Sequence, residues 1–136
     1  MNLTENFTLE EMIASSTADI LGIDNTPNDE ELSNLKNLCE KILQPIRNNY
    51  GRVVRVNSGY RCRELNRAIH GCEASQHLKG EAADITAHDN QLLWDMICEM
   101  ILKGEIKVGQ LIDEKHLKWI HVSLPTSRHF NQIIHM

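Results

Sequence analysis

The order of helical and strand-like segments predicts an α+β fold, with a small, mainly antiparallel sheet packed against helices. Two long segments carry apolar residues at helical spacing, and four short segments rich in Val, Ile or Ala are typical of strands. With 136 residues, 41% of them hydrophobic, the chain is long enough for one domain. We therefore expect a single domain over 1–136, in which residues 1–27 form an N-terminal arm with a short helix.

The first half of the chain is predicted to be helical. In TLEEM, Thr8 and Glu11 have the spacing of a capping box. The turn-rich stretch GIDNTPND separates this short helix from a long amphipathic helix over 29–51. Pro45 should kink or locally break the long helix, and Gly51 should end it. Its apolar stripe consists of Leu32, Leu35, Leu38, Cys39, Ile42, Leu43 and Ile46.

The second half is predicted to alternate between strands and helices. In order, we expect a strand over 52–60, a short helix over 63–71, a strand over 80–86 and a long helix over 89–105. Asp89 is a plausible cap of the long helix and Gly104 its stop. The apolar stripe of this helix consists of Leu92, Leu93, Met96, Ile97, Met100 and Ile101.

The C-terminal part is predicted to complete the sheet. KVGQLID (107–113) and KWIHVSL (118–124) have the pattern of two strands, and the intervening EKHL is short enough for a hairpin turn. The tail NQIIHM is a candidate edge strand.

The charge pattern excludes several classes of partner. The formal net charge is −5 and no basic run occurs, which argues against binding to nucleic acid or to an anionic membrane. No apolar stretch approaches the roughly 18 residues needed to span a bilayer. The N-terminus has neither a basic region nor an apolar core of the kind found in secretory signals, so we expect synthesis in the cytoplasm.

The four cysteines contain no CxxC pair, which argues against a thiolate zinc ribbon. Cys39 and Cys98 fall on apolar helix faces, and we expect them to be buried free thiols. Cys62 and Cys72 flank a helical segment and could pair in an oxidising compartment, but nothing marks the chain as secreted.

Two of the seven histidines have settings that suggest a metal site. His77 precedes a glycine and a strand that carries Asp84. His121 alternates with Trp119 and Ser123, so these three side chains share one face of a strand. Neighbouring strands could therefore bring two imidazoles and a carboxylate together. This donor set suits zinc and leaves a position for water, whose pKa can fall to about 7 in such a site.

Three motifs, SGYRC, SQHLKGEAADI and WIHVS, follow one another in the order found in the M15 zinc metallopeptidases. Together they resemble the zinc D-Ala-D-Ala carboxypeptidase branch and related phage endolysins. The hedgehog signalling domain and the D-Ala-D-Ala dipeptidases share this core. The opening FTLEEMIASSTADILGIDNTP also resembles small phage and prophage members, so the resemblance spans nearly the whole chain.

The resemblance implies a hedgehog/D-Ala-D-Ala-peptidase-like fold and zinc-dependent hydrolysis of peptide bonds in peptidoglycan stem peptides. The enzyme would be either a carboxypeptidase or an endolysin-type endopeptidase. It would act on the cell wall after release, or as a phage-associated protein, and we expect a monomer. The alternative is a catalytically inactive zinc-containing module that binds the cell wall or a protein.

The resemblance also assigns roles to individual residues. Arg61, in SGYRC, would face the substrate, where a guanidinium can bind a peptide carboxylate or stabilise an oxyanion. Ser75 would support the first metal ligand by hydrogen bonding. Trp119 would support the ligand strand or line the cleft. The predicted ligands of one Zn²⁺ are His77, Asp84 and His121.

The general base has three candidates. The dipeptidases carry a glutamate three residues before the last ligand, where this chain has Lys118. Other members have QLIxE before the ligand strand, and QLIDE here makes Glu114 the first choice. His116, five residues before His121, ranks second. Asp113 ranks third, because the connector to His121 is one residue longer than expected and could shift the register.

Overall fold

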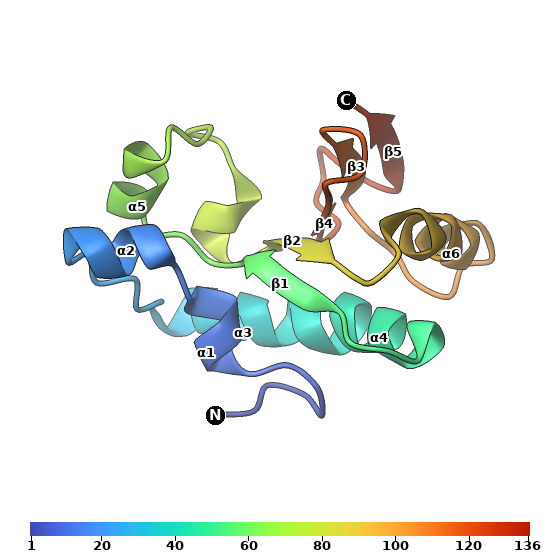
Figure 1. Ribbon diagram of the computed structural model, residues 1–136, viewed down its shortest axis with the longest axis horizontal. Coiled ribbons are helices and arrows are strands. Elements are labelled where there is room, and N and C mark those ends of the chain that lie inside the picture. The colour runs from blue at the N-terminus through green and yellow to red at the C-terminus, as the bar shows by residue number, and fades with distance from the viewer.

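The α+β prediction is confirmed by a computed structural model that describes residues 1–136 (Figure 1). Its sheet has the strand order β1-β2-β4-β3-β5. All neighbouring strands are antiparallel except β5, which runs parallel to β3. The expected hairpin is β3–β4, and the C-terminal tail does form an edge strand. The strands are β1 (Arg55–Ser58), β2 (Ala82–Thr86), β3 (Gln110–Glu114), β4 (Trp119–Ser123) and β5 (Gln132–His135).

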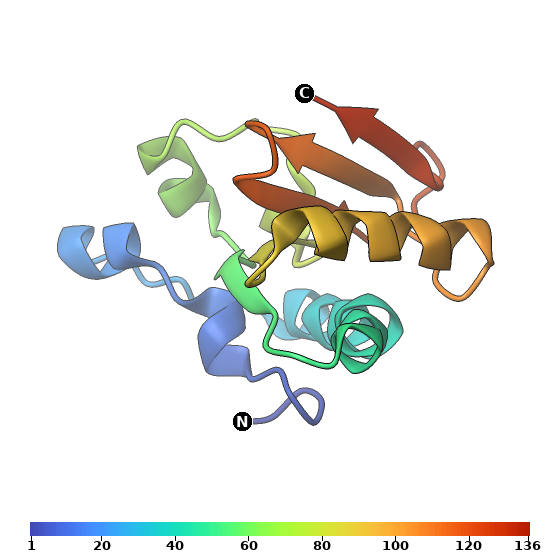
Figure 2. The same cartoon turned by 45° about the vertical axis from the view of Figure 1, so that its right-hand side comes forward.

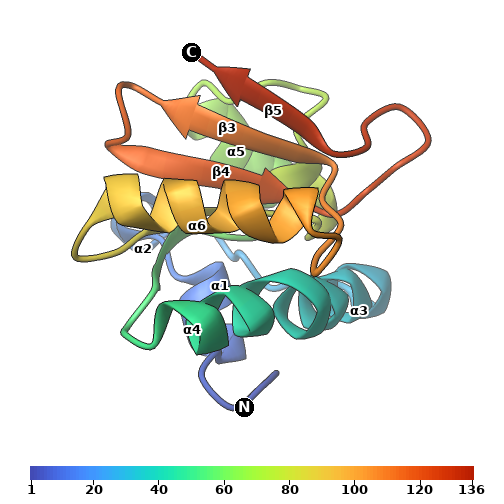
Figure 3. The same ribbon diagram turned by 90° about the vertical axis from the view of Figure 1, so that its right-hand side faces the viewer.

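The helices lie beside and below this sheet. They are α1 (Leu9–Ile13), α2 (Ser16–Leu21), α3 (Asp29–Leu38), a π-helix (Cys39–Leu43), α4 (Gln44–Tyr50), α5 (Arg63–Ala68), a 3₁₀ helix (Gln76–Lys79) and α6 (Asn90–Leu102). Figure 3 shows α6 between β4 and the long helical rod formed by α3 and α4. None of the helices is long and apolar enough to cross a lipid bilayer.

The long helix confirms the expected local disturbance before Pro45. The proline has no N–H and its ring crowds the preceding turn. The chain widens into the π-helix one turn earlier, where the Gln44 N–H bonds to the Cys39 carbonyl. The helix then continues to Gly51, which has the left-handed φ of 75° expected at its end. All the predicted stripe residues are fully buried except Leu32, which is half-buried.

The N-terminal arm is packed into the core of the molecule. Thr8 and Glu11 form the predicted capping box of α1. Leu3, Phe7 and Met12 belong to the same cluster of 24 buried residues as the long helices and the sheet. The arm is thereby fixed against the elements that carry the candidate site.

Four local predictions were wrong or incomplete. The first strand begins at Arg55 rather than residue 52, because Val53 is 63% exposed and has no strand to pair with. Leu92 is 56% exposed, and Trp94 takes its place on the buried face of α6. Helix α2 and the 3₁₀ helix were not predicted. Both are short and held by side-chain caps, from Ser15 and Ser75, rather than by an apolar stripe.

The sheet has one buried face and one face that carries the polar motif residues. Directly paired residues in neighbouring strands point to the same face. Asp84 pairs with His121, and Glu114 pairs with Trp119, so these four side chains share one face. Leu111, Ile85, Ile120 and Val122 point to the other face and are fully buried against the helices.

Candidate metal centre

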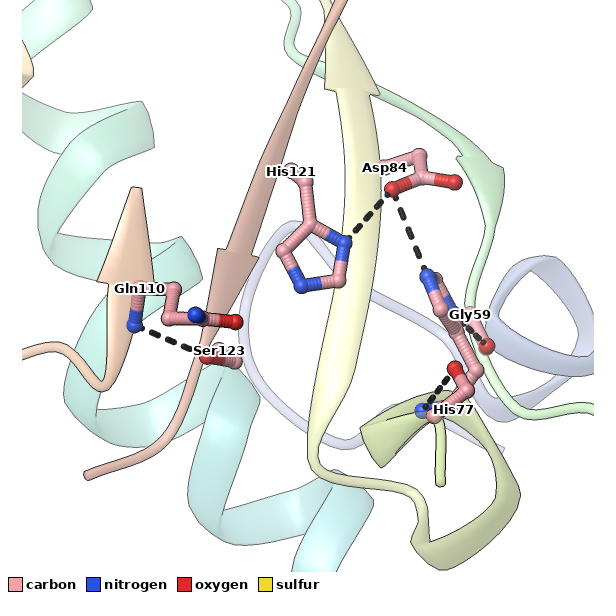
Figure 4. Close-up of polar contacts among 7 residues, drawn as sticks. Gly59, His77, Asp84, Gln110, His121 and Ser123 are labelled. Carbon is pink, nitrogen blue, oxygen red and sulfur yellow. Dashed lines mark hydrogen bonds and ion pairs between the residues drawn. The ribbon is translucent and has the colours of Figure 1, made fainter. Parts of the chain in front are cut away.

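Three potential metal ligands meet where β2 and β4 lie side by side (Figure 4). His77 is in the 3₁₀ helix, Asp84 is in β2 and His121 is in β4. One ligand atom from each of these side chains lies within 4.8 Å of the others. The direct pairing of Asp84 with His121 brings two of them together, and the turn before β2 brings in the third.

His77 is held by one hydrogen bond from its ring and one from its backbone. The residue is 2% exposed, and Nδ1 lies 2.7 Å from the Gly59 carbonyl oxygen, to which it donates. Nε2 is therefore the ring nitrogen that faces the cluster, and it lies 3.3 Å from Asp84 Oδ1. The backbone N–H of His77 also donates to Ser75 Oγ at 3.2 Å. Such a carbonyl contact fixes the imidazole tautomer and the ring orientation, as in known metal sites.

The turn after His77 requires glycine. Gly80 ends the 3₁₀ helix with a left-handed φ of 74°. A Cβ at this position would lie 2.6 Å from the carbonyl oxygen of Glu31 in α3. Ala82 and Ala83, the first two residues of β2, are fully buried, so this strand packs closely against its surroundings.

His121 completes the arrangement from β4. Its Nδ1 lies 3.0 Å from Asp84 Oδ1, and its ring centre is 5.1 Å from that of His77. Ser123, two residues further on, is fully buried and accepts a hydrogen bond from the Gln110 N–H at 3.0 Å. This contact ties the start of β3 to the ligand strand (Figure 4).

The electrostatics of the cluster favour an ionised carboxylate. Burial by itself would raise the pKa of Asp84, but hydrogen bonds and charge from His121 and His77 outweigh it. The pKa of Asp84 is thereby held well below its ordinary value. Two imidazole nitrogens and one carboxylate oxygen, with one imidazole oriented by a carbonyl, are a donor set that fits zinc with a position left open.

Arg61 lies next to this cluster, in the loop after β1. Its backbone N–H donates to the His77 carbonyl oxygen at 3.1 Å. The side chain is half-buried, and its Nε has no hydrogen-bond partner. Burial lowers the pKa of the guanidinium, while the negative charge of Asp84 opposes this effect. Arg61 therefore holds an unpaired hydrogen-bond donor near the candidate site.

A protein-family model described as Peptidase M15 matches residues 5–123, which include all three motifs and most of the arm. The chain belongs to the peptidase M15 family. Membership implies peptidase activity on a substrate that contains peptide bonds, and M15 peptidases are typically zinc-dependent. No curated protein matches the chain at a significant level.

The candidate bases of this M15 peptidase occupy different places. Glu114 is the last residue of β3 and lies directly opposite Trp119, on the face that carries His121. Asp113 pairs with Ile120 and so points to the opposite face, where it accepts from the Leu117 N–H at 2.7 Å.

His116 and Trp119 lie at the β3–β4 turn of the M15 peptidase. His116 is exposed in the turn, with a left-handed φ of 58°. Trp119 is half-buried, and the Lys115 ammonium lies 5.3 Å from its ring centre.

The cysteines of the M15 peptidase are free thiols. Cys39 is buried as predicted, whereas Cys98 is only half-buried. Cys62 and Cys72 do not form a disulfide; Cys62 instead caps α5 by accepting from the Leu65 N–H at 3.4 Å.

Sequence reasoning missed two residues that support the site. Gly59 provides the carbonyl that orients His77, and its position within the SGYR motif is the only signal that could have identified it. Asn25 bonds to the backbone around Arg61. A single asparagine in a turn-rich stretch gives no sign that it is buried.

Proposed function

We propose that this M15 peptidase hydrolyses peptide bonds in peptidoglycan stem peptides, with one Zn²⁺ held by His77, Asp84 and His121. The observation that carries the proposal is the convergence of these three donors, from two strands and a turn, in a member of a typically zinc-dependent family. The ordered motifs SGYRC, SQHLKGEAADI and WIHVS support stem peptides as the substrate class. When bound in such a site, zinc polarises the scissile carbonyl and activates water.

Arg61 is proposed to bind the substrate. A guanidinium with an unpaired, buried Nε is suited to a planar carboxylate or to a developing oxyanion. Its place beside the ligand cluster supports this role, because the charge of Asp84 acts on the guanidinium.

Glu114 is proposed as the general base, which takes a proton from the attacking water and passes it to the leaving amine. Of the three candidates, only Glu114 belongs to a strand and has its side chain on the same face of the sheet as His121. The turn position of His116 and the opposite orientation of Asp113 make these two residues weaker candidates.

Two further residues are proposed to support the reaction. Ser75 holds the backbone of His77 through its hydroxyl and so helps to fix the first ligand. Trp119, half-buried beside Glu114, is proposed to line the substrate cleft. We propose that the enzyme acts as a monomer on the cell wall.

The proposal is tested with zinc-loaded protein, purified peptidoglycan and a synthetic stem peptide that ends in D-Ala-D-Ala, with products identified by mass spectrometry. Release of the terminal D-Ala indicates a carboxypeptidase, whereas cleavage within cross-linked stems indicates an endopeptidase. Removal of zinc by a chelator should abolish either activity, and zinc should restore it.

The same experiment tests the alternative of an inactive binding module. The specific observation in its favour is Lys118, at the position where the dipeptidases have their glutamate. Zinc-loaded protein that binds peptidoglycan without cleaving any stem peptide would favour this alternative and contradict the enzymatic proposal.

A further inference from the structure

Asn25 lies in the turn between α2 and α3 and is only 8% exposed. Its side-chain amide donates two hydrogen bonds, to the carbonyl oxygens of Ile13 at 2.9 Å and Tyr60 at 3.0 Å. Its side-chain oxygen accepts a third, from the backbone N–H of Cys62 at 2.7 Å. The residue between the last two partners is Arg61.

The hydrogen bonds of Asn25 do more than attach the arm to the rest of the protein, because two of them are made next to Arg61. Burying an amide costs free energy unless its donors and acceptor are satisfied. The bond to Ile13 lies within the arm itself. The other two bonds reach across to the loop after β1 and fix the backbone immediately before and after Arg61.

The same loop is held from two further directions. The Tyr60 N–H donates to the Met12 carbonyl oxygen at 2.8 Å, and the Arg61 N–H donates to the His77 carbonyl oxygen at 3.1 Å. Figures 1 and 2 show α1 and α2 of the arm lying beside the chain that leaves β1. The backbone of residues 60–62 is therefore fixed between the arm and the ligand-bearing turn.

We propose that Asn25 is a positioning residue for Arg61: the buried amide of the N-terminal arm fixes the backbone on both sides of Arg61, so that the guanidinium is held ready for the substrate. The unpaired Nε of Arg61 supports this role. A buried N–H without a hydrogen-bond partner costs free energy, and a bound substrate could supply the missing acceptor. The inference rests on the proposed function, since the role of Arg61 does.

A double-mutant cycle tests the inference. Asn25→Ala, Arg61→Ala and the double variant are compared with wild type for kcat and KM on the synthetic stem peptide, with zinc content and thermal unfolding measured in parallel. Asn34→Ala is the matched control, because Asn34 likewise donates from its side chain to a backbone carbonyl, that of Lys79, but makes no hydrogen bond to residues 60–62. Should Asn25→Ala fail to fold, Asn25→Ser replaces it, because the hydroxyl puts no buried carboxylate against the carbonyl oxygens of Ile13 and Tyr60.

The expected result is a loss of about 10- to 100-fold in kcat/KM for Asn25→Ala with zinc retained, as misplacement of a binding group produces. In the Arg61→Ala background, the same change should have less than about a twofold effect, because coupled residues are non-additive. Equal losses in both backgrounds would show a merely structural role and overturn the inference. An active wild type that is unaffected by Arg61→Ala would overturn it as well, together with the role of Arg61.

If wild type cleaves no stem peptide, the proposed function has failed. A second measurement then tests the positioning role of Asn25 without relying on activity. Hydrogen exchange of the Cys62 and Arg61 backbone amides, which donate to Asn25 Oδ1 and to the His77 carbonyl oxygen, is followed by NMR in zinc-loaded protein. Asn25→Ala should accelerate both by about fivefold or more relative to Asn34→Ala, the equivalent of one lost hydrogen bond. Unchanged exchange at Arg61 would overturn the positioning role.

Discussion

The carbonyl oxygen of Gly59 accepts a hydrogen bond from Nδ1 of His77 at 2.7 Å, and this contact turns Nε2 of His77 toward Asp84. Gly59 is itself pressed against the arm, since a Cβ at this position would lie 2.3 Å from the Met12 carbonyl oxygen. The packing of α1 against the loop after β1 therefore bears directly on the orientation of the first proposed zinc ligand.

Gly59→Ala should weaken both the fold and zinc binding. The added methyl group must displace backbone, which costs about 1–3 kcal/mol of unfolding free energy by overpacking. The shifted carbonyl would no longer orient His77, and loss of such support typically lowers metal affinity about 10- to 100-fold. Chelator competition measures the zinc affinity, and urea denaturation measures the stability.

Gly22→Ala separates these two effects. Gly22 has a left-handed φ of 68° and open space around it, so alanine there should cost about 1 kcal/mol of stability through backbone strain alone. Its zinc affinity should remain that of wild type. Equal zinc affinity in Gly59→Ala and Gly22→Ala would contradict the orienting role of the Gly59 carbonyl.

Glu114→Gln should lower kcat on the stem peptide by about 100-fold or more while the protein retains zinc, because the base is lost and the ligands are not. Asp113→Asn is the matched carboxylate-to-amide change at the neighbouring residue of β3. It should leave kcat near wild type, since Asp113 points to the opposite face and the amide oxygen can still accept from Leu117. The reverse pattern, with activity lost in Asp113→Asn alone, would show that the base is assigned to the wrong residue.

Alkaline pH should destabilise the protein through Cys39. Burial, with the charges of Glu11 and Glu40, raises the pKa of its thiol from 9.0 to about 12. Between these pH values the folded state keeps a proton that the unfolded chain has lost, so the free energy of unfolding falls as pH rises. Urea denaturation should show a loss of about 1 kcal/mol between about pH 8 and pH 10 that is absent in Cys39→Ala.

Cys72→Ala controls for this effect, because Cys72 is exposed and the variant keeps the buried thiol. It should therefore show the full pH dependence of wild type. A Cys39→Ala protein that loses as much stability as wild type over this range would show that another group is responsible.

The local patterns in the sequence were enough to predict the fold class and most elements. The helical stripe of Leu35 to Ile46 was correct because every member is buried against one core. The strand pattern wrongly included Val53 in the first strand, although tertiary packing leaves this residue exposed. The helical pattern placed Leu92 rather than Trp94 on the buried face of α6. Helix α2 escaped detection because its apolar residues Ile20 and Leu21 are exposed and form no buried stripe.

The candidate site was only partly accessible to sequence reasoning. His77, Asp84 and His121 were chosen because ordered motifs contain them, but their meeting depends on the register of β2 with β4, which no local pattern encodes. The distinction between Asp113 and Glu114 likewise needed the register of β3. Gly59 and Asn25 act through backbone atoms of distant segments, and such contacts leave no periodic signal.

The central claim is that His77, Asp84 and His121 hold a single zinc ion, and elemental analysis of purified protein tests it most directly. Wild type should contain about one zinc per chain, and His77→Ala, Asp84→Ala and His121→Ala should contain almost none, because each removes one of three donors. His88→Ala, a change of an exposed histidine outside the cluster, should retain the zinc. Wild type without zinc even after zinc is added, or zinc retained in all three ligand variants, would contradict the claim.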